Sequence, residues 1–160
     1  MKGYLTVLLF IAGVASASEP ASDKYTIDSD RQLILSNGNI KAVGNVHAVS
    51  GDMTINAGEA IYHRENPSNM FITATGNPIR YKGITENGKP FTGRSKQLHY
   101  TPETGEVILT DEAFVQQDGH FLSAEVITYN TITKKIIASS APGKRVRSVI
   151  YPDKVPQTKK

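Results

Sequence analysis

Four histidines are the first side chains in this sequence that could ligate a metal or transfer a proton. They are His47, His63, His99 and His120. No two of them have the HxH or HxxxH spacing that directs a pair of imidazoles to one ion, and the chain has no cysteine to supply a thiolate. We therefore interpret the histidines as solvated side chains on strands, and we expect no metal and no cofactor.

The acidic and hydroxyl side chains also lack a catalytic pattern. The chain has no GxSxG sequence, so the sharp turn that exposes a nucleophilic serine is not indicated. Glu59, Glu112 and Glu125 are far apart in the chain, and no sequence feature pairs them for glycoside hydrolysis. Asp28, Ser29 and Asp30 form an acidic cluster that could bind a cation, but Asp and Ser are common turn residues that hydrogen-bond their own backbone. We expect that the protein is not an enzyme.

Apolar side chains, by contrast, follow a regular pattern. On both sides of Gly51 and Asp52, apolar residues alternate with polar ones over residues 44–62. A period of two is typical of half-buried strands, so this stretch predicts two strands joined by a tight turn. After Ala57 the pattern shifts by one residue. A bulge or a corner must absorb that shift if the side chains are to stay on one face.

The same shift recurs in the segments that end at Tyr100 and Tyr129, which indicates an internal repeat. Glycine, asparagine and proline mark the boundaries between the alternating segments. We expect turns at Asn37-Gly38, at Gly44-Asn45, at residues 76–78 and at Asp111-Glu112. Roughly twelve to sixteen short strands with such turns, and no long helix, predict a sandwich, jelly roll or barrel.

Residues 1–17 form a separate unit ahead of the strands. A positively charged start, an apolar run over residues 3–14 and the small residues 15–17 are typical of a cleaved secretory signal peptide. An uncleaved anchor is the alternative, but a membrane span needs about 20 apolar residues, and this run is shorter. We expect one mature β-domain over residues 18–152 and a flexible tail over residues 153–160.

Net charge and apolar patterning argue against nucleic-acid binding but do not identify a ligand. The net charge is +3, and the dense basic stretch is confined to residues 144–147, which is a weak signature for nucleic-acid binding. The alternating apolar residues can either close into a dry core or line a groove that is open to a ligand. Acyl chains suit a groove, because each buried methylene contributes roughly 0.8 kcal/mol. Periodicity is compatible with both arrangements.

Short motifs, each weak alone, occur in a specific order along the chain. They are IDSD (27–30), GNV (44–46), INA (55–57), NGKP (87–90), QLHY (97–100), VILT (107–110), ITY (127–129) and GKRV (143–146). Together they resemble the OstA-like family of periplasmic lipopolysaccharide-transport proteins, over residues 25–151. One departure is Asp111-Glu112, where Gly-Asn is usual in this family, and a turn should tolerate that exchange.

The resemblance implies a twisted, open β-jellyroll, in which two sheets form a V around a hydrophobic groove. It implies a protein of the Gram-negative periplasm that binds the lipid A acyl chains and passes lipopolysaccharide from the inner to the outer membrane. Family members stack head to tail. They meet an LptC-like inner-membrane protein at the N-terminal edge and an LptD-like outer-membrane protein at the C-terminal edge.

The apolar phase of each strand gives candidate residues for these roles. We expect the lipid to contact Ile27, Leu35, Val46, Ala48, Met53, Ile55, Tyr81, Leu98, Tyr100, Leu109, Ile127 and Tyr129. The first strand (residues 24–28) and the last (residues 145–151) are expected to be open edges that pair with partner strands. The partner-edge residues are Tyr25, Ile27, Val146 and Val149.

Two alternatives stay open. The soluble domains of LptC and LptD share the fold, but an LptC would keep its N-terminal anchor and an LptD would continue into a long barrel. A different class is an exported structural β-module with a dry core and no lipid ligand. Lipopolysaccharide that copurifies with the protein, detected by mass spectrometry, would distinguish a carrier from such a module.

Overall fold

A computed structural model describes residues 24–152; the predicted signal peptide and C-terminal tail lie outside this range. Its ten strands, in chain order, are β1 (Thr26–Asp28), β2 (Arg31–Ile34), β3 (Ile40–Ser50), β4 (Met53–His63), β5 (Phe71–Ile84), β6 (Pro90–Thr101), β7 (Glu106–Gln117), β8 (His120–Asn130), β9 (Ile136–Ser139) and β10 (Arg147–Val149). Within this range, no helix is long and apolar enough to cross a membrane. The prediction of an all-β protein is confirmed.

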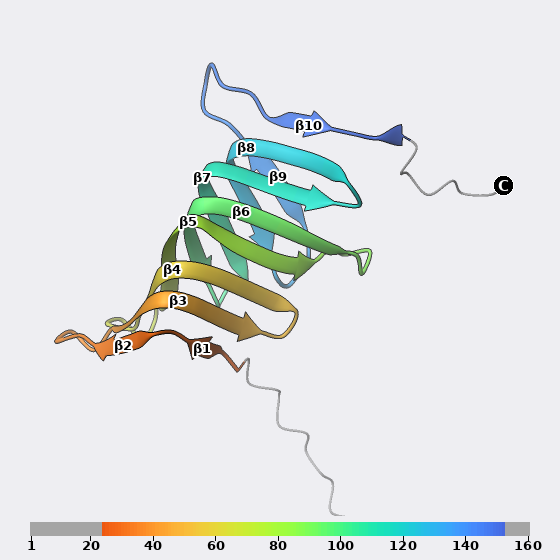
Figure 1. Cartoon of the computed structure of the whole chain (residues 1–160). Coiled ribbons are helices and arrows are strands. Elements are labelled where there is room, and N and C mark those ends of the chain that lie inside the picture. The colour runs from red at the N-terminus through yellow and green to blue at the C-terminus, as the bar shows by residue number, and fades with distance from the viewer. Residues whose placement is uncertain (1–23, 153–160) are drawn as a thin grey trace, which may run out of the picture.

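All the strands belong to one antiparallel sheet with the order β1-β3-β4-β5-β6-β7-β8-β10, while β2 pairs with β3 and β9 pairs with β8. Figure 1 shows the strands stacked in chain order, with β1 near one end of the stack and β10 at the other. Consecutive strands are antiparallel neighbours, so short turns suffice to connect them. The sheet remains open, because β1 and β10 do not pair with each other.

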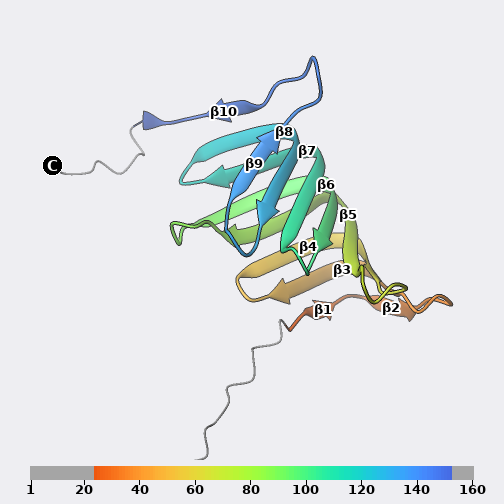
Figure 2. The same cartoon turned by 180° about the vertical axis from the view of Figure 1, so that it is seen from behind.

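A line of bulges divides this sheet into two halves. The register shifts once in every central strand pair, between Val43/Val46, Asn56/Glu59, Thr75/Ile79, Arg94/Gln97 and Thr110/Ala113. The shift predicted after Ala57 is thereby confirmed. Aligned bulges bend all the strands at the same level, and Figures 1 and 2 show the two resulting layers from opposite sides.

We name the halves after their edge strands. The β1/β10 half-sheet contains β1, β10 and residues 46–50, 53–57, 79–84, 90–94, 113–117 and 120–124. The β2/β9 half-sheet contains β2, β9 and residues 40–43, 59–63, 71–75, 97–101, 106–110 and 126–130. This bent, open sheet confirms the predicted jellyroll class.

Three of the expected turns were wrong. Gly44-Asn45, residues 76–78 and Asp111-Glu112 lie inside β3, β5 and β7, so the strands are fewer and longer than expected. Gly44, Asn45, Asp111 and Glu112 all have a positive φ. Bulges and tight turns both use this left-handed backbone region and favour the same residue types. The sequence signal was therefore real, but it marked a bend within a strand. The turns at Asn37-Gly38 and Gly51-Asp52 are confirmed.

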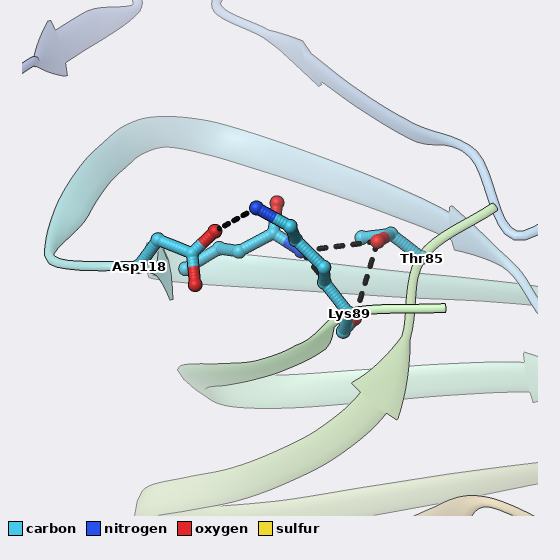
Figure 3. Close-up of polar contacts among 4 residues, drawn as sticks. Thr85, Lys89 and Asp118 are labelled. Carbon is cyan, nitrogen blue, oxygen red and sulfur yellow. Dashed lines mark hydrogen bonds and ion pairs between the residues drawn. The ribbon is translucent and has the colours of Figure 1, made fainter. Parts of the chain in front are cut away.

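Polar contacts hold two neighbouring hairpins together at the turns of the β1/β10 half-sheet. Lys89 Nζ donates to Asp118 Oδ2 at 2.7 Å, and Gln117 Nε2 donates to Thr85 Oγ1 at 3.0 Å (Figure 3). These contacts join the β5–β6 turn to the β7–β8 turn. Both sides of the Lys89–Asp118 pair are 41% exposed, so the pair contributes about 1 kcal/mol at most. Its role is to keep the two hairpins side by side.

Candidate functional site

The inner face of the β2/β9 half-sheet carries a continuous row of apolar side chains. Each residue of this row is the direct cross-strand partner of the next: Tyr62, Ile72, Tyr100, Val107, Tyr129 and Ile136. The tyrosines that end the three repeated segments therefore lie at one level of the sheet. The repeat in the sequence is a repeat in space.

The β1/β10 half-sheet presents a second row toward the same interior. It consists of Ile27, Ala48, Ile55, Tyr81, Gly93, Val115 and Leu122. Aromatic contacts connect the two rows: the Tyr81 and Tyr129 rings are 5.6 Å apart, and Phe91 is 4.8 Å from Tyr129. The interior between the half-sheets is thus filled at this level by three packed rings.

Most of the predicted lipid-contacting residues lie in this interior. The buried core includes Val46, Met53, Ile55, Tyr81, Leu98, Tyr100, Leu109, Ile127 and Tyr129, and Ile27 and Ala48 pack against it. Leu35 is the exception: it is half-buried and does not belong to this core. It follows β2 at the turn into β3, where the apolar alternation no longer determines which face a side chain occupies.

The core is tightly packed around Tyr81. Its ring is 0% exposed, and its hydroxyl has no hydrogen-bond partner. Burial raises the pKa of Tyr81, and the nearby Tyr129 and Tyr100 raise it further. The hydroxyl therefore stays neutral, and Tyr81 has the surroundings of a packing residue.

A large apolar pocket opens at the N-terminal end of the interior. Its volume is about 660 Å³, and it lies between β1, the β4–β5 loop and the β6–β7 turn. The residues that line it are Tyr25, Ile27, Tyr62, Pro67, Ser68, Met70, Ile72, Pro102 and Glu103. Tyr25, Ile27 and Ile72 also pack against the buried core, so the floor of the pocket is the interior of the jellyroll.

Sequence reasoning found only part of this pocket. Ile27 was predicted to contact lipid, and Tyr25 was predicted as an edge residue, but Tyr62 and Ile72 were missed as site residues. Tyr62 ends the first repeated segment, and Ile72 lies on the apolar phase of β5, so both carried a usable signal. Met70 and the neighbouring loop residues carried none, because the position of a loop depends on what it packs against.

Specific hydrogen bonds position the mouth of the pocket. The hydroxyls of Tyr25 and Tyr100 are 3.0 Å apart, and Tyr62 Oη donates to Met70 Sδ at 3.1 Å. The β4–β5 loop is held in addition by Glu65 and Asn39. Glu65 accepts hydrogen bonds from the side chains of Asn37 and Asn39, and Asn39 Oδ1 accepts one from the Arg64 N–H at 3.0 Å.

The histidines do not line this pocket, and its one carboxylate is Glu103. His63 and His99 stack on the two sides of Phe71, with ring separations of 4.3 and 4.8 Å. Asp30 accepts a hydrogen bond from Asn45 Nδ2 at 2.9 Å, which ties the acidic stretch to the bulge of β3. Among residues 24–152, no three His, Asp or Glu side chains are grouped to hold a metal ion. The candidate binding site of the interior is therefore the apolar pocket.

The predicted edge strands are edges, with different bounds. β1 pairs only with β3, and β10 pairs only with β8. Val149 lies in β10, but Val146 precedes it and is 40% exposed. The β2/β9 half-sheet adds two further edges that the sequence analysis did not identify as such. Each end of the stack therefore presents two strands, β1 with β2 and β9 with β10.

Comparison with known proteins agrees with this architecture. Residues 26–135 match the family described as LptA/(LptD N-terminal domain) LPS transport protein. The lipopolysaccharide export system protein LptA of Escherichia coli is 33% identical over 158 residues, which cover 92% of this chain and 85% of that protein. The protein of the same name from Haemophilus influenzae is 26% identical, with 99% of both chains covered.

A solved structure shows the same fold. The crystal structure of LptH, the LptA homologous periplasmic component of the lipopolysaccharide transport device of Pseudomonas aeruginosa, matches with a TM-score of 0.71. The match covers 81% of this chain and 96% of that chain at 20% identity. The family match, the LptA relatives and the open, bent sheet with its apolar interior lead to one conclusion: this chain belongs to the family of LptA and LptD N-terminal-domain lipopolysaccharide transport proteins.

Proposed function

We propose that this protein is a periplasmic carrier that binds the acyl chains of lipopolysaccharide and passes the lipid from the inner to the outer membrane. The LptA relatives that span the chain support this role, as does the family match. Residues 1–17 serve as a cleaved export signal, and the mature domain acts outside the cytoplasm. The family is one of transport proteins, in agreement with the expectation that the chain is not an enzyme.

The single observation that carries the proposal is the apolar pocket at the N-terminal end. Its floor is continuous with the buried core, and its charged lining residue is Glu103. A pocket of this kind favours hydrocarbon, because buried methylenes stabilise the complex by roughly 0.8 kcal/mol each. The negative charge of Glu103 would repel a lipid phosphate, so the headgroup would remain outside the pocket.

Photo-crosslinking tests the pocket directly. A crosslinking amino acid at Tyr62, which lines the pocket, should give an adduct with lipopolysaccharide in cells. The control position is Thr75, which is exposed on the β2/β9 half-sheet. Adducts at neither position, with no copurified lipid, would favour the structural β-module with a dry core. Equal adducts at both positions would indicate unspecific lipid contact.

The edge strands support head-to-tail assembly. β10 of one copy can pair with β1 of the next, which would extend the sheet and its interior from molecule to molecule. The natural chain has no cysteine, so single cysteines report contacts without background. Thr26→Cys mixed with Ser148→Cys should form the mixed disulfide dimer. Predominant 26–26 or 148–148 dimers would show a symmetric contact and would contradict the head-to-tail arrangement.

The same two ends are the proposed partner sites. The β1 and β2 end would receive an LptC-like inner-membrane protein, and the β9 and β10 end would receive an LptD-like outer-membrane protein. A bulky thiol reagent on Thr26→Cys should then block the first contact alone, and the same reagent on Ser148→Cys should block the second alone. This assignment of the two ends would be contradicted if the modified Thr26→Cys variant lost the LptD-like partner, or if the modified Ser148→Cys variant lost the LptC-like partner.

A further inference from the structure

The two outer faces of the bent sheet differ in charge. On the β1/β10 half-sheet, Arg80 is the cross-strand partner of Arg94, and Arg94 is the partner of Phe114. Phe114 pairs with Ser123, and Ser123 pairs with Arg147. Three arginines therefore lie in one row across β5, β6, β7, β8 and β10. Side chains alternate between the faces of a strand, and the inner face here carries Tyr81 and Gly93.

Lys82 lies two residues after Arg80 on β5, on the same face and beside this row. All four cations are exposed, and none forms an ion pair within residues 24–152. We call this surface the basic face: Arg80, Lys82, Arg94 and Arg147, together with the rings of Phe114 and Phe121. The β2/β9 half-sheet differs, because its outer Lys41 is paired with Glu59 at 2.9 Å.

The basic face places like charges side by side, and none of its cations has an acidic partner within residues 24–152. Like charges directly opposite each other on paired strands are destabilising, and Arg80 and Arg94 are such a pair. Arg80 and Arg94 line a surface pocket of about 190 Å³. The other lining residues include Lys82, Thr92, Phe114 and Gln116, and none of the lining residues is a carboxylate. The natural complement of this surface is an external array of anions.

Aromatic rings beside the cations narrow the chemistry of that array. The Arg94 guanidinium lies 4.2 Å from the centre of the Phe114 ring, and Phe114 is 5.4 Å from Phe121. Both rings are half-buried. Aromatic and basic side chains together are typical of surfaces that rest at the headgroup level of a membrane.

We propose that the basic face docks the protein on a membrane surface by binding the phosphates of anionic phospholipid headgroups. Guanidinium groups bind phosphate through paired hydrogen bonds. The neighbouring rings would insert at the headgroup level. Docking would hold the open ends of the stack close to a membrane.

The phosphates of the carried lipid are a poor fit for the basic face. If acyl chains occupy the interior, the headgroup emerges from the pocket, on the inner side of the sheet. Arg80, Lys82 and Arg94 point to the opposite side, with the backbone of β5 and β6 in between. The proposal rests on the proposed function for the presence of a nearby membrane, but it concerns a different surface.

Vesicle sedimentation tests the proposal with the full mature chain. The protein should partition onto vesicles of phosphatidylglycerol and phosphatidylethanolamine, and much less onto phosphatidylcholine vesicles. The test variant combines Arg80→Gln, Lys82→Gln and Arg94→Gln. Since each basic side chain near an anionic surface contributes about a fivefold gain in partitioning, the triple variant should lose roughly a hundredfold.

A charge-matched control separates a specific face from net charge. Arg31→Gln, Arg64→Gln and Lys135→Gln remove the same three charges from exposed positions away from the basic face, and this variant should partition within a few-fold of the natural protein. Equal losses in both variants would overturn the proposal, as would equal binding of the natural protein to both kinds of vesicle. If the natural protein binds neither, the membrane proposal fails and an acidic protein becomes the fitting occupant.

A second readout keeps this test independent of the carrier function. The melting temperature of each variant shows that it is folded, and the Tyr62 photo-crosslink to an acyl chain should be unchanged in the triple variant. Specific vesicle binding without the Tyr62 adduct would contradict the carrier function but support the membrane role of the basic face. The Tyr62 adduct without specific vesicle binding would support the carrier function and contradict the membrane role of the basic face.

Discussion

Tyr129 donates a hydrogen bond of 2.6 Å from its hydroxyl to the backbone carbonyl of Ile84. Tyr129 belongs to the β2/β9 half-sheet and Ile84 to the β1/β10 half-sheet, so this bond crosses the interior. The Tyr129 ring is 2% exposed and packs against Phe91 and Tyr81. The two layers are therefore fastened to each other away from the bulge line as well as along it.

Removing that bond should loosen the contact between the layers. Tyr129→Phe keeps the ring and leaves the Ile84 carbonyl without this partner, so the free energy of unfolding should fall by about 1 kcal/mol. Urea unfolding followed by circular dichroism measures the change. An unchanged midpoint would show that the hydrogen bond makes no net contribution.

Tyr81→Phe is the matched change with the opposite expectation. The Tyr81 hydroxyl is buried without a partner, and an unsatisfied buried hydroxyl costs about 1–3 kcal/mol. Its removal should leave stability unchanged or increase it. A loss of stability as large as that of Tyr129→Phe would mean that the hydroxyl is satisfied in solution.

The pH dependence of Tyr81→Phe offers an independent check. Burial raises the pKa of Tyr81 above its usual value of 10.0, so folding favours the neutral phenol. A raised pKa contributes stability that is present below the unfolded value and is lost as the pH rises above it. The natural protein should therefore lose stability above about pH 10 more steeply than Tyr81→Phe, as thermal melts across that range would show.

The bulge of β7 contains two non-glycine residues in the left-handed region. Glu112 has φ 56° and Asp111 has φ 62°, and such a conformation costs roughly 1 kcal/mol for a residue with a Cβ. Glu112→Gly should relieve this strain and raise the free energy of unfolding by up to about 1 kcal/mol. The exposed Lys96–Glu112 ion pair is lost at the same time, at a cost of a few tenths of a kcal/mol, roughly.

The equivalent bulge of β3 provides the control. Gly44 has φ 80°, and a Cβ there would collide with the Asp30 side chain. Gly44→Ala should therefore destabilise the fold by at least about 1 kcal/mol in the same urea assay. If both substitutions changed stability in the same direction, backbone strain would not be the property that distinguishes the two bulges.

Glu125 should make the fold sensitive to acid. A hydrogen bond from the Ala141 N–H, followed by the positive charge of Lys144, holds the pKa of Glu125 below its usual value of 4.5. A lowered pKa contributes stability that is present above the unfolded value and is lost as the pH falls through the folded value. Glu125→Gln should be less stable than the natural protein near neutral pH, with the difference disappearing in acid. A difference that stays constant with pH would exclude the carboxylate charge as its source.

Several features of this protein could be read from the sequence because they depend on local geometry. Side chains alternate on any strand, so the apolar phase identified inner residues such as Ile55, Leu98 and Ile127. The phase shift after Ala57 located a bulge for the same reason. The motif order also led to the right family.

Other features were decided only by the tertiary structure, since they depend on which strands are neighbours. A left-handed residue pair such as Asp111-Glu112 becomes a bulge only if a partner strand continues on both sides of it. The pocket forms between β1 and the β4–β5 loop, and Glu65 and Asn39 hold this loop to the β2–β3 turn, a contact between distant segments. The arginines of the basic face are scattered in the sequence, and the registers of five strands are what place them in one row.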